Sequence, residues 1–220
     1  MKWIGHAAFE IELDGLLILV DPWIEGNPSS CYKLDDVRRA DYVLVTHDHS
    51  DHMGDSIEIC KKTGACFVSI FEVAEEAASR GVERVVGLNV GGVASLGGLR
   101  VVVTPALHSS IRGTPCGFIV IGEEGSVYHA GDTGLFYDIS LYAKLYPIDV
   151  ALVPIGGYYT MDPLQAAEFV SLARPEIAVP MHYGTFPQIE QKPEEFAEFA
   201  KARAPGVRVE ILKPGEVLML

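Results

Sequence analysis

The sequence is poor in cysteine and in positive charge. Its four cysteines, Cys31, Cys60, Cys66 and Cys116, form no C-x-x-C pair, so we expect reduced thiols rather than a disulfide framework. Lys and Arg together number 17 against 30 Asp and Glu, which gives a formal net charge of −13. Proteins that bind nucleic acid through its phosphates usually present a basic face, and this charge balance disfavours that class.

Long hydrophobic runs are also missing, although 49% of the residues are hydrophobic. The longest compact apolar run, Leu16–Val20, is much shorter than the roughly 20 residues that a membrane helix needs. Only one Lys precedes the acidic residues that begin at Glu10, a pattern unlike a signal or transit peptide. We therefore expect a cytoplasmic globular protein with one continuous domain, residues 1–220, and no membrane partner.

Short apolar runs alternate with amphipathic helical patterns along the chain. A hairpin is expected where Ala8–Leu13 turns at Asp14-Gly15 into Leu16–Val20. Further strands are expected at residues 42–45, 101–104, 117–121, 126–130, 150–154, 177–181 and 207–212. Helices are expected at residues 57–62, 71–80, 164–173 and 194–204. The mixture of hairpins and helical crossovers favours a layered α/β (α+β) sandwich over a doubly wound parallel sheet.

The most informative segment is residues 43–52, in which an apolar strand leads directly into His47-Asp-His-Ser-Asp-His52. Imidazoles at positions i and i+2 in a loop can point to one side, and residues after the turn can reach a point a few ångströms away. Two metal ions in hydrolytic sites lie about 3.5–4 Å apart, so these donors serve two ions better than one. A polar loop with coincidental histidines is the weaker interpretation, because three of the seven histidines fall here.

Three more donors follow later strands. His108, Asp132 and His182 come soon after the strands expected at 101–104, 126–130 and 177–181. The ends of strands are positions where a scaffold can fix ligands while the loops shape a pocket.

Together these residues resemble the metal-ligand motifs of the metallo-β-lactamase superfamily: His47-x-His49-x-Asp51-His52, then His108, Asp132 and His182. The resemblance extends over essentially the whole chain. Segments 5–9, 21–22, 154–157 and 160–162 are similar to those of small metal-dependent hydrolases related to ascorbate-6-phosphate lactonase. This resemblance implies a four-layer αβ/βα sandwich of two mixed β-sheets flanked by helices, with a dinuclear site at one edge of the sheets.

The same resemblance implies how the donors divide between two ions. One ion would be held by His47, His49 and His108, the other by Asp51, His52 and His182, and Asp132 would bridge them. A hydroxide bridging the ions would be the nucleophile, with Asp51 and Asp132 as the catalytic carboxylates. Imidazole and carboxylate donors suit Zn²⁺ best and are also compatible with Mn²⁺, Fe²⁺ or Ni²⁺. Such a centre would be locally positive and would suit a small anionic substrate.

Differences from other branches of the superfamily narrow the expected activity. In the antibiotic-hydrolysing enzymes a cysteine occupies the position of Asp132, so a true β-lactamase is not implied. The branches that process tRNA or degrade mRNA carry an exosite arm or an inserted domain, and 220 residues leave no room for such a domain. Glyoxalase II enzymes add a C-terminal helical domain that we do not find after His182. A compact hydrolase of a small ester, lactone or phosphodiester remains.

Several other residues are expected to support the site. Asp21, which follows a strand, is expected to accept a hydrogen bond from a ligating histidine. His6 and His129 are expected to be hydrogen-bonded rather than to bind metal, and Asp162 is expected to cap the helix behind it. Substrate contacts are expected from Thr160, Tyr183, Gly184 and Thr185.

Two alternative functions stay open at this point. One is a nuclease or phosphodiesterase acting on RNA or single-stranded DNA, which the net charge of −13 disfavours. The other is a metal-binding protein without turnover, which the intact Asp51 disfavours. Related lactonases form homo-oligomers, so the resemblance allows for a homo-oligomer here.

Overall fold

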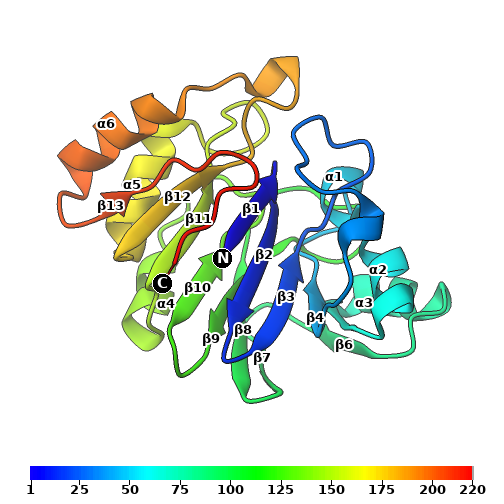
Figure 1. The fold of residues 1–220 in the computed structure, drawn as a ribbon. Coiled ribbons are helices and arrows are strands. Elements are labelled where there is room, and N and C mark those ends of the chain that lie inside the picture. Colours follow the sequence, from blue (N-terminus) through cyan, green and yellow to red (C-terminus); the bar gives the residue numbers. More distant parts are fainter. Residues whose placement is uncertain (220) are drawn as a thin grey trace.

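The computed structural model describes residues 1–219 and contains two β-sheets that face one another, with helices on their outer faces (Figure 1). The expected fold class, a four-layer αβ/βα sandwich, is confirmed. The first sheet has the order β1-β2-β3-β4-β5-β6. Its strands are β1 Lys2–Gly5, β2 Ala8–Leu13, β3 Leu16–Val20, β4 Tyr42–Leu44, β5 Cys66–Ile70 and β6 Val85–Leu88. The strands from β1 to β3 pair antiparallel, and those from β3 to β6 pair parallel.

The second sheet has the order β13-β12-β11-β10-β9-β8-β7. Its strands are β7 Val93–Leu96, β8 Leu99–Pro105, β9 Cys116–Ile121, β10 Ser126–His129, β11 Val150–Pro154, β12 Ile177–Met181 and β13 Arg208–Val209. The strands from β7 to β10 pair antiparallel and those from β10 to β13 pair parallel. Both sheets are therefore mixed.

Helices form the two outer layers because parallel strands need a crossover connection, which is usually helical. On the right of Figure 1, α2 Ser56–Thr63 and α3 Phe71–Ser79 cover the first sheet, near the single-turn α1 Ser50–Met53. On the left, α5 Pro163–Ala173 and α6 Pro193–Arg203 cover the second sheet, with α4 Ile139–Leu145 below them. Two 3₁₀ turns, η1 Leu34–Asp36 and η2 Pro187–Ile189, lie in loops. No helix among residues 1–219 is long and apolar enough to cross a membrane.

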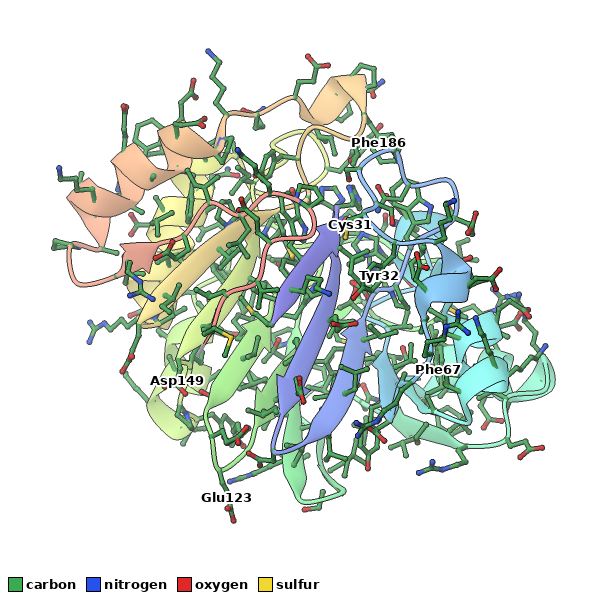
Figure 2. The ribbon with its side chains drawn as sticks, viewed as in Figure 1. Cys31, Tyr32, Phe67, Glu123, Asp149 and Phe186 are labelled. Atoms are coloured by element: carbon green, nitrogen blue, oxygen red, sulfur yellow. The ribbon has the colours of Figure 1, made fainter. Side chains whose placement is uncertain are left out.

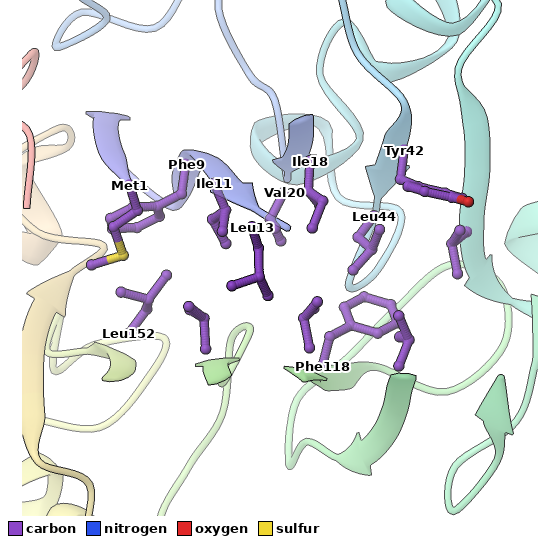
Figure 3. Packing of buried hydrophobic residues seen from close by; sticks show 14 of the residues in the cluster. Met1, Phe9, Ile11, Leu13, Ile18, Val20, Tyr42, Leu44, Phe118 and Leu152 are labelled. Atoms are coloured by element: carbon purple, nitrogen blue, oxygen red, sulfur yellow. The ribbon is translucent and has the colours of Figure 1, made fainter. Parts of the chain in front are cut away.

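The central core lies between the sheets. Alternate residues of β2, namely Phe9, Ile11 and Leu13, point into it and face Phe118 of β9 and Leu152 of β11 (Figure 3). In β3 and β4, alternate residues point into the central core, and the residues between them pack on the opposite face against α2 and α3. These two strands are therefore buried on both faces. A third cluster joins the second sheet to α4, α5 and α6. This packing fixes the strand ends that carry the candidate ligands.

Most of the predicted elements are present with small changes at their ends. The hairpin of β2 and β3 is confirmed, and Asp162 caps α5 by accepting a hydrogen bond from Gln165 N at 2.7 Å. The strand predicted at 207–212 was wrong in length, because only Arg208–Val209 pairs with β12. The short strands β1 and β5 and the helix α4 were not predicted. The apolar runs of these elements are too short to show a clear helical or strand periodicity in the sequence alone.

Candidate metal centre

The seven predicted ligands meet at one edge of the two sheets. His47 follows β4, and α1 begins directly after His49, where His52 N and Met53 N donate to His49 O at 3.0 and 2.8 Å. This single turn carries Asp51 and His52 back toward the strand end. From the other sheet, His108, Asp132 and His182 follow β8, β10 and β12. The fold therefore brings together donors that are up to 135 positions apart in the chain.

The first donor group consists of His47, His49 and His108, whose ligand atoms all lie within 4.8 Å of one another. His47 Nε2 lies 2.9 Å from His49 Nδ1. The ring centroid of His108 lies 5.1 Å from those of both other histidines. His47 is buried, whereas His49 and His108 are partly exposed. Three imidazoles at this spacing can share one ion and leave a position open toward the solvent.

The second donor group consists of His6, Asp51, His52 and His182, again within 4.8 Å of one another. Its three histidines are almost completely buried. It is therefore more enclosed than the first donor group, and it includes a carboxylate.

Asp132 lies between the two donor groups. Its Oδ2 is 3.0 Å from His182 Nε2, 3.3 Å from His52 Nε2 and 3.5 Å from His108 Nε2. One carboxylate thus reaches histidines of both groups, which is the position that a bridging ligand requires.

Several atoms of the centre are buried without a hydrogen-bond partner among residues 1–219. They are Nε2 of His6, His52 and His182, Nδ1 of His182 and Oδ1 of Asp132. The three Nε2 atoms lie 3.0–3.4 Å from carboxylate oxygens but are not aligned with them for a hydrogen bond. A buried polar group without a partner costs about 1–3 kcal/mol, so such a cluster needs compensation. Lone pairs converging on a cation supply it, and the donor set fits a divalent metal.

The surroundings of Asp132, Asp51 and His47 favour the ligating forms of these three side chains. Burial alone would raise the pKa of Asp132, but His182 and His52 hold it well below its ordinary value. Burial also opposes ionisation of Asp51, yet the neighbouring imidazole of His6 and the charge of His52 lower its pKa. Burial lowers the pKa of His47 well below its usual value. Ionised carboxylates and a neutral imidazole are the forms that bind a metal.

His52 is held by Asp21 from behind. Asp21 Oδ2 lies 2.7 Å from His52 Nδ1, and the same carboxylate accepts hydrogen bonds from Thr46 N at 2.8 Å and Thr46 Oγ1 at 2.7 Å. Burial alone would lower the pKa of His52, but the carboxylates of Asp132 and Asp21 raise it well above its ordinary value. Asp21 thus has the geometry expected of a residue that fixes the tautomer of a ligand.

His6 lies closer to the candidate ligands than the sequence indicated. Its Nδ1 is 2.6 Å from Thr185 Oγ1, and its Nε2 is 3.4 Å from Asp51 Oδ2. Burial, followed by the charge of neighbouring His182, lowers the pKa of His6 to about 4. Its φ of 56° and that of His182, 57°, are left-handed, a conformation rare outside glycine and common at functional sites. His6 lies in the turn between β1 and β2, and no signal in the sequence indicated this turn because β1 was not predicted.

His129 lies apart from both donor groups and has the hydrogen bonds that were expected of it. Its Nε2 lies 2.8 Å from Ala7 O, and its Nδ1 accepts from Gly131 N at 3.1 Å. His129 therefore supports the backbone directly before Asp132.

A pocket of about 390 Å³ opens over the centre. Its floor is formed by His49, Asp51, His108, Asp132 and His182. Its walls are formed by Ser109, Tyr159, Phe186 and Gln188.

The predicted substrate contacts Thr160, Tyr183, Gly184 and Thr185 are not among the residues that line this pocket. Thr160 is buried, Tyr183 packs on Trp3 with ring centroids 5.5 Å apart, and Thr185 bonds His6. Their neighbours Tyr159 and Phe186 face the pocket instead. Which side chain of a loop faces inward depends on these tertiary contacts, which the sequence did not reveal.

Asp48 is a further residue that the sequence reasoning missed, although it lies inside the histidine motif. Its Oδ1 accepts hydrogen bonds from Ile111 N at 2.8 Å and from Ser110 Oγ at 3.2 Å. Arg112 lies 3.5 Å from its other oxygen. Asp48 therefore ties the loop after His108 to the loop that carries His47 and His49.

Comparisons with known proteins agree with this geometry. A family described as "Beta-lactamase superfamily domain" matches residues 17–183. A UPF0173 metal-dependent hydrolase of Caldivirga maquilingensis is 54% identical over 100% of this chain and 97% of its own length. A UPF0173 metal-dependent hydrolase of Methanopyrus kandleri is 52% identical over 98% of this chain and 97% of its own length. The solved structure of Igni18, a metallo hydrolase of Ignicoccus hospitalis, is 44% identical with a TM-score of 0.92, covering 98% of this chain and 95% of its own.

Proposed function

The chain belongs to the metallo-β-lactamase superfamily and is a metal-dependent hydrolase, and from this premise we propose that it works with two divalent ions on a small ester, lactone or phosphodiester. The observation that carries the proposal is the position of Asp132, whose Oδ2 lies within 3.5 Å of histidines from both donor groups. A carboxylate in that position can bind two ions at once.

Each side chain has a distinct task in this proposal. His47, His49 and His108 hold one ion, and Asp51, His52 and His182 hold the other, with Asp132 shared. Asp21 keeps Nε2 of His52 directed into the centre through its bond to Nδ1. Divalent ions bound there would lower the pKa of water from 15.7 to about 7 and would stabilise charge developing on the substrate oxygen. We propose Zn²⁺ as the native metal, since imidazoles dominate the donor set.

The proposal is tested by reconstitution. Protein stripped with a chelator is loaded with Zn²⁺, Mn²⁺, Fe²⁺ or Ni²⁺ and assayed with a lactone, with 4-nitrophenyl acetate and with bis-4-nitrophenyl phosphate. We expect hydrolysis of at least one substrate that depends on metal and is lost in His47→Ala. The control is Asp35→Ala, a surface variant that removes no histidine. The side chain of Asp35 is fully exposed. Turnover that survives chelation, or no turnover with any of the metals, would overturn the proposal.

A further inference from the structure

The walls of the pocket carry no positively charged side chain. Among the described residues, those that line it include two carboxylates, Asp51 and Asp132, but no Lys or Arg. Arg112, on the loop after His108, is paired with Asp48 and Glu76. A bound metal would therefore be the only positive charge available to a substrate inside this pocket, and the chain as a whole carries −13.

One wall is aromatic and is held in place before any ligand binds. The ring of Phe186 stacks on Trp23 with centroids 5.8 Å apart and planes at 17°. It also meets the edge of His6 at 5.6 Å. In Figure 2 Phe186 lies beside the loop that follows β3, which carries Trp23. Because these contacts fix the ring, little conformational entropy is lost when a ligand packs on it.

A second aromatic ring comes from a different loop. Tyr159 follows β11, lines the pocket and is half exposed. Its loop is fixed by hydrogen bonds from Tyr158 N to Gly156 O and from Gly157 N to Met161 O, each 3.0 Å long. Large half-exposed rings at the mouth of a pocket gain free energy when an apolar group covers them.

We propose that the substrate carries an apolar group, preferably an aromatic one, that packs on Phe186 and Tyr159, and that it has no charge beyond that of the reacting group. This rests on the proposed function and narrows its substrate class. A second anionic group would meet no cation in the pocket and would lie near Asp51 and Asp132. The volume of about 390 Å³ is within the range of small-molecule sites, so a compact aryl or alkyl ester or lactone fits.

The test uses three esters with the same 4-nitrophenol leaving group: the acetate, the 4-phenylbutanoate and the singly charged succinate half-ester. In the metal-loaded enzyme we expect kcat/KM to be about tenfold higher for the phenylbutanoate than for the acetate, and lowest for the half-ester. Phe186→Ala and Tyr159→Ala should remove most of the preference for the phenylbutanoate. Tyr137→Ala, an exposed aromatic residue that does not line the pocket, should leave it unchanged.

A binding measurement separates this inference from the proposed function. Uncharged 4-phenylbutanamide is titrated into metal-free protein while the fluorescence of Trp23, beside Phe186, is followed. We expect saturable binding that Phe186→Ala weakens about fivefold, even if no ester is cleaved. The inference is overturned if binding is unchanged in Phe186→Ala, or if the half-ester is cleaved as well as the phenylbutanoate. Faster cleavage of single-stranded RNA than of any ester would also overturn it.

Discussion

The two donor groups lie side by side and share Asp132, but they are built differently. The first donor group has three histidines, two of which are partly exposed, and it opens into the pocket. The second donor group has three buried histidines and the partly exposed Asp51, which lines the same pocket together with His182. It is braced from behind by Asp21 and Thr185. Two of its histidines have left-handed φ values. This difference indicates that the second donor group is organised before an ion arrives. We therefore expect the second donor group to be occupied first and to bind its ion more tightly than the first donor group does.

The largest effect is expected when the shared carboxylate is removed. Asp132→Ala would take the shared ligand from both ions and would remove the carboxylate that lies 3.3 Å and 3.0 Å from the buried Nε2 atoms of His52 and His182. A loss of about 4 kcal/mol in transition-state stabilisation corresponds to a fall in kcat/KM of roughly 10³-fold. Elemental analysis should find fewer than two ions per chain. Asp35→Ala is the matched control. If Asp132→Ala bound two ions and kept full activity, Asp132 would not be a ligand shared by the two donor groups.

The two donor groups can be broken separately with His182→Ala and His108→Ala. We expect each variant to retain one ion per chain after gel filtration. The ion left in His108→Ala should resist a competing chelator better, because the second donor group adds the carboxylate of Asp51 to the shared Asp132. The comparison fails if the ion left in His182→Ala is the tighter one. Thermal unfolding before and after chelation provides a check, because bound metal stabilises the folded state.

Asp21→Asn should have a smaller effect that falls mainly on the second donor group, because Asp21 contacts His52 directly and reaches His47 only through Thr46 Oγ1. An amide at this position keeps the shape of the side chain but weakens the bond to His52 Nδ1, and comparable changes cost about 10–100-fold in metal affinity. The affinity of the remaining tight site should fall by that factor in a His108→Ala background. An equal loss at the first donor group, measured in a His182→Ala background, would show that Asp21 acts on general stability instead.

Asp48→Asn should give the smallest effect, confined to the first donor group. The substitution weakens the bonds to Ser110 and Ile111 and so loosens the loop that carries His108. We expect the weaker metal site to lose severalfold in affinity, since one or two hydrogen bonds of about 1 kcal/mol are involved. Arg112→Ala, which removes only the partly exposed ion pairs of Arg112 with Asp48 and Glu76, is the control and should change little. A larger effect on the tight site would contradict this assignment.

The sequence placed the candidate ligands at the ends of apolar strands and predicted most of the strands, whereas the two-sheet architecture was implied by the resemblance to the superfamily. The ligands follow apolar strands, and the hairpin of β2 and β3 has a clear alternation and an Asp-Gly turn, so both signals are local. The contribution of His6 could not be predicted in the same way. Its placement depends on the contact between the β1–β2 turn and the loop after β12, where His182 N donates to His6 O at 3.1 Å.

The pocket walls were the least predictable part of the site. Thr185 and Phe186 are neighbours in the chain, yet one bonds His6 and the other lines the pocket. The direction of each side chain follows from the stacking of Phe186 on Trp23, a residue 163 positions earlier. Loop side chains have no periodicity that would indicate such a contact.

The most direct test of the account is anomalous diffraction from crystals of metal-free protein soaked with Zn²⁺, at a limiting and at a saturating concentration. We expect one peak among Asp51, His52, His182 and Asp132 at the limiting concentration. A second peak among His47, His49, His108 and Asp132 should appear at saturation. A single peak at every concentration, or first occupancy of the first donor group, would contradict the account of two unequal sites that share one carboxylate.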